Sequence, residues 1–332
     1  MKIVFFGTPQ FAVPSLKRLL AHSEFEVLAV ITQPDKRRGR GGKVTPSPVK
    51  AIALDTDCPI WQPARLKKEA DILSKLRALE ADAFVVVAYG QLLSQEILDM
   101  PRLGCVNAHG SILPQYRGAA PIQWCLYNGE QKTGVTTMLM DAGMDTGPTL
   151  MEESISIQLT DNSLDLAKQL SILSADLLMT TLQKLQQQMI RPVPQDDERA
   201  TYAPLIKKAD YELDWSKSAK ALHDQVRGFY PNCITHFRES PLKVSATLPL
   251  GSDHWLELPA ELKSLYENAS LNAEAAPGTV VAVLKSYGPV VQTGSGHLLL
   301  GEVKPAGKRT LSGWDFANGS RIECGEQMIV SQ

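Results

Sequence analysis

Two polar residues that could act on a carbonyl group stand two positions apart in the stretch NAHGSILPQYRGAAPIQW, residues 107–124. They close the strand-like run GCVNAHG, whose two-residue period places Cys105, Asn107 and His109 on one side before Gly110 ends the run. An Asn amide donates hydrogen bonds without titrating, and His also donates and binds a proton near neutral pH. The pair suits a carbonyl oxygen that becomes negatively charged, where one donor is typically worth about 10² to 10³ in rate.

A carboxylate is expected close to this pair. The strand-like run TGVTTMLMD leads into AGMDTGPT, so Asp141 and Asp145 follow a second strand end among glycines that permit sharp turns. Ligands meet the carboxyl ends of strands in open parallel sheets. If the two strands are neighbours, a carboxylate orients the His109 ring and favours its protonated form. Because no Ser or Cys is obviously placed as a nucleophile, the set suits direct attack by a substrate's own nucleophile.

The same residues have simpler interpretations. An Asn-x-His pair at a strand end often only caps the strand or completes hydrogen bonds in the core. Asp145-Thr146-Gly147 matches the aspartic-protease signature, but that family needs two such sequences in all-β lobes, and this chain has one in an α/β context. GTPQF after the first apolar run resembles a dinucleotide turn but lacks G-x-G-x-x-G, so we expect no NAD.

Short apolar runs alternate with helical patterns through the first half of the chain. Strands without polar alternation, separated by helices, favour an α/β, Rossmann-like, mostly parallel sheet with helices on both faces. The predicted strands lie at 2–7, 25–32, 83–90, 104–109, 133–141 and 150–157, and the predicted helices at 11–22, 65–80 and 163–189, the last as one helix or two.

The pattern changes after residue 189. Residues 190–208 hold three prolines and clustered charges without periodicity, which indicates a linker. Short runs separated by Gly and Pro at 277–284, 288–296 and 297–305 favour a small, OB-like β-barrel, preceded by a helix around 216–228. Residues 240–276 show no clear pattern. The predicted domains are therefore 1–189 and 209–332.

Composition narrows the class of protein. The 332 residues have a net charge of −2 and an apolar share typical of globular chains. No apolar run approaches a membrane span, and the N-terminal run is too short for a signal peptide. The five cysteines, odd in number and without C-x-x-C, and the six histidines, without ligand spacing, indicate neither a disulfide framework nor a metal site. They fit a reducing cytoplasm.

A basic segment lies at PDKRRGRGGKVTPSPVK, residues 34–50. Five positive charges fall within eight residues there, at Lys36, Arg37, Arg38, Arg40 and Lys43. Most charge runs are solvated loops, but arginines interleaved with glycines also suit a nucleic-acid phosphate backbone. The sequence leaves both interpretations open.

Several of these motifs together resemble one family. GTPQFAVPSL, TQPDKRRGRGGKVTPSPVK, VVVAYGQLL, LGCVNAHGSILPQYRGAAPIQW and GVTTMLMDAGMDTG are similar, in this order, to motifs of the methionyl-tRNA formyltransferase family. The N-x-H and D-x-G-x-D-T-G patterns are shared with the wider folate-dependent formyltransferases. The resemblance extends through the linker to PAGKR, and the basic segment and C-terminal domain favour the initiator-tRNA branch.

The resemblance implies a reaction and a set of residues. The reaction is transfer of a formyl group from 10-formyltetrahydrofolate to the α-amine of methionine on initiator methionyl-tRNA. The family's catalytic residues fall on Asn107, His109 and Asp145. Its folate-contacting residues fall on Ser111, Ile112, Leu113 and Pro114, with Ile replacing one Leu, and on the loops that hold Tyr89, Gly90, Gln91, Leu92 and Asp141.

The tRNA contacts implied by the resemblance fall on Lys36, Arg37, Arg38, Arg40 and Lys43, with Arg40 as the key contact to the acceptor stem. The C-terminal domain is implied to bind tRNA as well. The position after S-I-L-P usually holds a basic residue in the family, and this chain has Gln115 there. We also expect a monomer with no membrane association.

Three alternatives remain open at this stage. A formyltransferase for a ribonucleotide amine or an amino sugar would share the cleft, but it would not explain the basic segment and the barrel together. A formyl-folate hydrolase would turn over folate with water and no amine acceptor. A non-catalytic RNA-binding module would bind RNA without folate, and it would leave the Asn107, His109 and Asp145 set unexplained.

The basic segment generates a direct prediction. Arg40→Ala should weaken binding of the tRNA substrate, with a smaller dependence of affinity on salt, because one phosphate contact and its released counterion are lost. The measurement is the tRNA dissociation constant over a range of salt concentrations. An unchanged salt slope would count against a phosphate contact by this segment.

Overall fold

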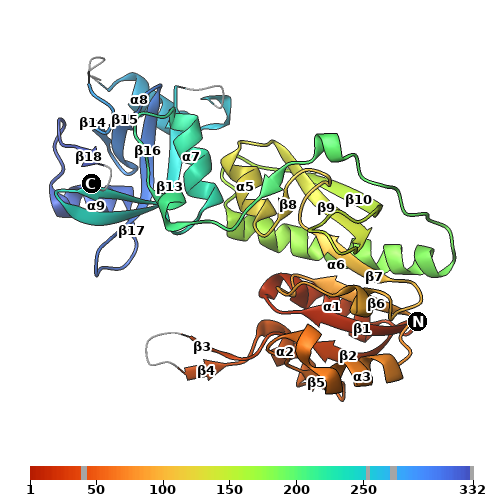
Figure 1. The fold of residues 1–332 in the computed structure, drawn as a ribbon. Coiled ribbons are helices and arrows are strands. Elements are labelled where there is room, and N and C mark those ends of the chain that lie inside the picture. Colours follow the sequence, from red (N-terminus) through yellow and green to blue (C-terminus); the bar gives the residue numbers. More distant parts are fainter. Residues whose placement is uncertain (39–42, 252–254, 270–274, 330–332) are drawn as a thin grey trace. The chain divides into compact units, whose positions relative to one another are not determined.

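The computed structural model describes residues 1–38, 43–251, 255–269 and 275–329, and the chain folds into two compact units (Figure 1). Unit 1 consists of Met1–Pro121, Lys132–Ile155 and Ala167–Pro204. Unit 2 consists of Ile122–Gln131, Ser156–Leu166 and Leu205–Gln332. Two short pieces of the first half therefore belong to the unit that holds the C-terminal sheet.

Unit 1 is built on a seven-stranded sheet with the order β10-β9-β7-β6-β1-β2-β5. The pairs β1–β2, β1–β6, β6–β7 and β2–β5 are parallel, and β7–β9 is antiparallel. The strands are β1 (Lys2–Gly7), β2 (Glu26–Ile31), β5 (Ile60–Trp61), β6 (Ala83–Val87), β7 (Cys105–His109), β9 (Lys132–Leu139) and β10 (Thr149–Ser156). The predicted mostly parallel sheet is confirmed.

Apolar side chains leave both faces of the central strands, which explains their unbroken apolar sequences. Val4 and Phe6 of β1 pack in a cluster with Leu73 of α3, while the intervening Phe5 is fully buried too. The helices of this half are α1 (Val13–Ala21), α2 (Pro48–Ala53), α3 (Ala70–Ala78), α4 (Gln95–Leu98) and α6 (Ser163–Gln186). The 3-10 turns η1 (Gln10–Ala12) and η2 (Leu66–Lys68) precede α1 and α3.

One long helix, α6, occupies the region where the sequence left one helix or two open. Its first turn is capped by Asn162, whose Oδ1 accepts the backbone N–H groups of Leu164 at 2.9 Å and Asp165 at 3.2 Å. Farther along, the Thr181 hydroxyl meets Thr137 of β9 at 2.9 Å. This hydrogen bond and the buried Leu178 and Leu182 attach the helix to the sheet.

The segment that the sequence indicated as a linker is hydrogen-bonded to unit 1 over residues 193–203. Val193 pairs with Thr149, and a 3-10 turn, η3 (Asp197–Arg199), follows. Strand β11 (Tyr202–Ala203) then pairs in parallel with β8 (Arg117–Gly118). This segment is hydrogen-bonded to other parts of unit 1. Its sequence lacks a helical repeat of apolar residues because its chain is mostly extended.

Unit 2 holds a curled, mostly antiparallel sheet with the order β14-β15-β16-β13-β12-β18, and β17 on β16. The sheet is curled into a half-barrel (Figure 1). A bridge between Thr279 and Gln327 connects the segments that precede its two edge strands, β14 and β18. The predicted β-barrel is confirmed in this form. The strands are β12 (Ile234–Phe237), β13 (Ser240–Leu250), β14 (Val280–Leu284), β15 (Gly288–Gln292), β16 (His297–Pro305), β17 (Leu311–Ser312) and β18 (Met328–Ile329).

Aromatic packing gives unit 2 its own core. Phe229 stacks on Tyr127 of α5 (Pro121–Tyr127) at 5.1 Å between ring centroids and meets Trp124 edge-on at 5.2 Å. The remaining helices are α7 (Ala219–Gly228), α8 (Ala260–Glu267) and α9 (Gly313–Ser320), with 3-10 turns η4 (Lys208–Tyr211) and η5 (Trp255–Glu257). β13, η5 and α8 fall in residues 240–276, where the sequence showed no clear pattern.

The tight approach of β9 to β10 generates a stability prediction. A Cβ added at Gly134 would overlap the Glu153 carbonyl oxygen, so Gly134→Ala should destabilise unit 1 by about 1–3 kcal/mol. Gly319→Ala, a helical glycine with open space around it, is the matched control and should cause no loss of stability. Both variants are tested by calorimetric unfolding. An unchanged unfolding temperature for Gly134→Ala would show that β9 and β10 accommodate the added methyl group without loss of stability.

Candidate active site

Strand β7 carries the two residues that the sequence singled out. It lies between β6 and β9, with Asn107 opposite Val86 on one side and Met138 on the other. His109 is the last residue of β7 and lies opposite Thr136 of β9. Since β9 runs antiparallel to β7, its last residue, Leu139, lies beside Val106 near the start of β7. The loop after β9 must therefore run back along β7 to bring Asp145 to His109. The structure thus brings His109 and Asp145 together, with Asn107 two residues before His109 on β7.

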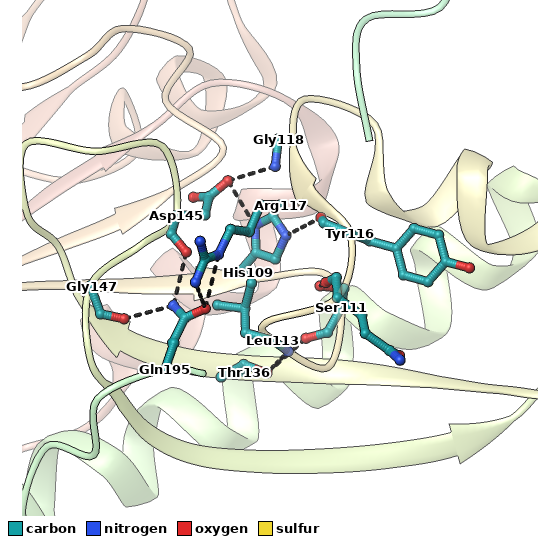
Figure 2. Close-up of polar contacts among 11 residues, drawn as sticks. His109, Ser111, Leu113, Tyr116, Arg117, Gly118, Thr136, Asp145, Gly147 and Gln195 are labelled. Carbon is teal, nitrogen blue, oxygen red and sulfur yellow. Dashed lines mark hydrogen bonds and ion pairs between the residues drawn. The ribbon is translucent and has the colours of Figure 1, made fainter. Parts of the chain in front are cut away.

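The His109 ring lies between two acceptors (Figure 2). Its Nε2 is 2.9 Å from the Tyr116 carbonyl oxygen, and its Nδ1 is 3.6 Å from Oδ2 of Asp145. A carbonyl oxygen only accepts, so Nε2 carries a hydrogen. The Nδ1 distance is longer than a hydrogen bond, so Nδ1 makes no short bond to Asp145. The two side chains are 7% and 17% exposed, which limits solvent screening of their interaction.

Asp145 is held by main-chain geometry. Its φ of 55° is in the left-handed region, and its Oδ2 accepts the Gly118 N–H at 2.9 Å. Upstream in the same loop, Oδ1 of Asp141 accepts the Gly143 N–H at 3.0 Å and the Thr146 hydroxyl at 2.7 Å. Asp141 therefore builds the loop that presents Asp145, and its predicted folate contact stays a prediction.

Asn107 has an unpartnered polar atom. Its Oδ1 is buried and forms no hydrogen bond within the described part of the chain. A buried polar atom without a partner is costly unless a ligand completes it. Rotation of the amide by 180° keeps its shape, so either the oxygen or the NH₂ group can face that point. The amide is thus positioned to bind a polar ligand group.

The segment after β7 is fixed by its own side chains. The buried Ser111 hydroxyl donates to the Gln115 carbonyl oxygen at 2.6 Å, which commits it to the turn. The Thr136 hydroxyl accepts the Leu113 N–H at 3.0 Å and donates to the Ser111 carbonyl oxygen at 2.8 Å. Leu113 is buried, whereas Ile112 and Pro114 are partly exposed and Gln115 is exposed.

The Tyr89–Leu92 segment follows β6. The Tyr89 ring packs edge-on against Phe6, and burial raises the pKa of its hydroxyl above the usual range. The Tyr89 hydroxyl, like Oδ1 of Asn107, is buried and forms no hydrogen bond within the described residues. Gly90 has a φ of 84°, which favours glycine, and Leu92 is 70% exposed.

An open pocket of about 320 Å³ lies beside this segment, lined by Arg65, Lys67, Gln91 and Leu92. Gln91 fixes one wall, because its amide accepts the Leu66 N–H at 2.9 Å and donates to the Pro63 carbonyl oxygen at 3.0 Å. Arg65 and Lys67 were missed by the sequence analysis, since they begin an ordinary helical pattern and only the fold brings them to residues 91–92.

The basic segment forms a two-stranded hairpin of β3 (Lys36–Arg38) and β4 (Lys43–Thr45) (Figure 1). Lys36 pairs with Thr45, and Arg38 with Lys43. The strand pairing replaces the loop that the sequence suggested. Arg40 lies outside the described residues.

Two further features concern metals and membranes. Among the residues that the structure describes, no group of three or more His, Cys, Asp or Glu side chains could hold a metal ion. Within the same ranges, no helix combines the length and the apolar character needed to cross a membrane.

Comparison with known proteins decides the family. Residues 1–182 match the family described as Formyl transferase, and residues 205–321 match Formyl transferase, C-terminal domain. A methionyl-tRNA formyltransferase of Trichormus variabilis is 62% identical over 328 residues and 98% of each chain. One of Trichodesmium erythraeum is 60% identical over 328 residues, again 98% of each chain.

The chain belongs to the methionyl-tRNA formyltransferase family.

The expected family resemblance is thereby confirmed, and the protein is a formyl-transferring enzyme. The fold agrees. The crystal structure of WlaRD, a sugar 3N-formyl transferase in the presence of dTDP and 5-N-formyl-THF, has a TM-score of 0.64. It is 20% identical and covers 93% of this chain and 99% of its own. At this identity the likeness concerns the fold alone.

Proposed function

We propose that this protein transfers the formyl group of 10-formyltetrahydrofolate to the α-amine of methionine on initiator methionyl-tRNA, giving N-formylmethionyl-tRNA. The proposal is supported by the approach of Asp145 to His109 at the end of β7, with Asn107 two residues before His109, in a chain with relatives of this name and high identity. Both substrates are soluble, and the reaction is a single acyl-type transfer.

The three polar residues have separate tasks in the proposed reaction. As the neutral methionyl amine attacks the formyl carbon, the Asn107 amide donates a hydrogen bond to the formyl oxygen, which gains negative charge. His109 uses Nδ1 for the same oxygen, because Nε2 is committed to the Tyr116 carbonyl and Nδ1 makes no short bond to Asp145. Asp145 keeps that ring protonated and oriented, and it accepts the amine's proton through a water. Asp145 then returns that proton through the water to the folate nitrogen, which leaves as the bond to the formyl carbon breaks.

The folate is proposed to lie between the Tyr89–Leu92 segment and the Asp141–Gly147 loop, against residues 111–114. Support comes from the partly exposed side chains of Ile112 and Pro114 and the exposed side chain of Leu92. The side chains of Ser111 and Tyr89 are buried, so their contribution is to shape the main chain. Holding both substrates in register contributes to the rate by proximity.

The tRNA is proposed to contact the β3–β4 hairpin through Lys36, Arg37, Arg38, Arg40 and Lys43. In support, Lys36 is exposed and lies in the paired part of this hairpin. The proposed organisation is a catalytic domain at 1–189, a linker at 190–208 and an OB-like tRNA-binding domain at 209–332.

The protein is further proposed to be a cytoplasmic monomer. All five cysteines are free thiols, which fits a reducing compartment. Burial raises the pKa of the Cys105 and Cys233 thiols to about 12, so both stay protonated and unreactive at neutral pH.

Asn107→Ala tests the oxyanion role. Turnover should fall by about 10² or more, because a donor to the charged oxygen is lost, while folate affinity stays close to that of the parent. The assay incubates enzyme with formyl-folate and charged initiator tRNA and measures formyl-methionine. Gln187→Ala, at an exposed residue just after α6, is the control. Turnover of the Asn107 variant near that of the parent would remove Asn107 from the mechanism.

Asp145→Asn tests the carboxylate. The amide keeps the shape and can still accept the Gly118 N–H, but it carries no charge and is a poor base. Turnover should therefore fall by about 10² or more. Asp176→Asn, at an exposed surface ion pair with Arg18, is the matched control and should be active. An active Asp145→Asn enzyme would show that the carboxylate's charge has no part in the reaction.

A further inference from the structure

Residues 193–203 contact both main-chain segments that hold the proposed catalytic pair. Gln195 lies against the loop that contains Asp145 (Figure 2). Thr201 lies against the loop of residues 114–120. All of these residues belong to unit 1. From the sequence, residues 190–208 were predicted to be a linker.

Gln195 uses its whole side-chain amide. Its Nε2 donates to the carbonyl oxygens of Asp145 at 2.8 Å and Gly147 at 2.7 Å. Its Oε1 accepts Nε of Arg117 at 3.1 Å and Nη2 of Arg117 at 2.8 Å. A guanidinium only donates, so it fixes the amide with the oxygen towards Arg117 and the NH₂ group towards the loop.

Arg117 is itself immobilised. It is 2% exposed, and its Nη2 also lies 2.8 Å from Oδ1 of Asp197. Burying a charged side chain is costly unless its donors are paired. Gln195 and Asp197 supply that pairing, and the main chain of Arg117 lies in β8 beside Gly118, which binds the Asp145 carboxylate.

The other end of the segment holds the 114–120 loop. The Thr201 hydroxyl accepts the Tyr116 N–H at 2.8 Å, and the Thr201 carbonyl oxygen accepts the Arg117 N–H at 2.9 Å. The Ala203 carbonyl oxygen accepts the Ala119 N–H at 2.9 Å. The two groups that fix His109 and Asp145, the Tyr116 carbonyl and the Gly118 N–H, are both on this loop.

We propose that Gln195 is a positioning residue for formyl transfer, which sets the Asp145 carboxylate against His109 by binding the main-chain carbonyls of Asp145 and Gly147. The inference rests on the role of Asp145 given under the proposed function. The left-handed φ of 55° at Asp145 is unfavourable for a residue with a side chain, so it needs such fixation. With both carbonyls bound, the direction of the Asp145 side chain is determined.

Gln195→Glu distinguishes the role of the amide NH₂ group from that of the amide oxygen. The carboxylate still accepts from Arg117, but it cannot donate to either carbonyl and places negative charge against them. We expect kcat to fall by about 10- to 100-fold, as expected for a catalytic group displaced by roughly 1 Å, with little change in the KM of either substrate. Gln187→Ala, an exposed glutamine just after α6, is the control and should match the parent.

A double-mutant cycle distinguishes positioning from a general effect on folding. If Gln195 acts through Asp145, Gln195→Glu should cause little further loss of kcat in the Asp145→Asn enzyme. The same loss in both backgrounds would overturn the proposal, as would a parent-like kcat for Gln195→Glu. The unfolding temperature of each variant, measured in parallel, should remain near that of the parent. A fully active Asp145→Asn single variant would instead refute the role of Asp145 itself.

Discussion

The site depends on main-chain groups that hold one imidazole and one carboxylate at a fixed separation. Neither His109 nor Asp145 is placed by its own packing alone. The Tyr116 carbonyl sets the ring through Nε2, and the Gly118 N–H sets the carboxylate. Both groups lie on one short loop, so the relative position of the two side chains follows from the conformation of that loop.

The loop is in turn fixed by parts of the chain that are distant in sequence. β8 pairs with β11 at Gly118 and Ala203, where a Cβ at Gly118 would lie 2.7 Å from the Ala203 carbonyl oxygen. Glycine is needed there both for this close approach and for its φ of 123°. The parallel sheet then places the end of β7 beside this loop. The geometry of the proposed catalytic pair thus follows from backbone pairing, so it would need little reorganisation when charge develops.

The sequence predicted those strands whose pattern of apolar residues lies within one short stretch of the chain. Unbroken apolar runs identified β1, β2, β6 and β7, and the two-residue period together with Gly110 placed Asn107 and His109 at a strand end. Asp145 was found because it follows β9, although the antiparallel direction of that strand could not be read from the runs themselves.

Contacts between residues that are distant in sequence could not be predicted. Gln195 resembles any polar residue of a proline-containing linker, and only the fold shows its contacts with the Asp145 and Gly147 carbonyls. Tyr89 was placed at the folate by its motif, yet its ring belongs to the core beside Phe6. β13 was obscured because Pro241 and Pro249 interrupt its sequence, although Pro241 pairs with His236 of β12 and Pro249 with Leu298 of β16.

The central claim is that Asn107 and His109 together bind the formyl oxygen. The most direct measurement is a crystal structure of the enzyme with a stable formyl-folate analogue. The account predicts the formyl oxygen within about 3.1 Å of both the Asn107 amide nitrogen and Nδ1 of His109. A formyl oxygen directed away from both groups, with the rest of the folate bound in order, would contradict it.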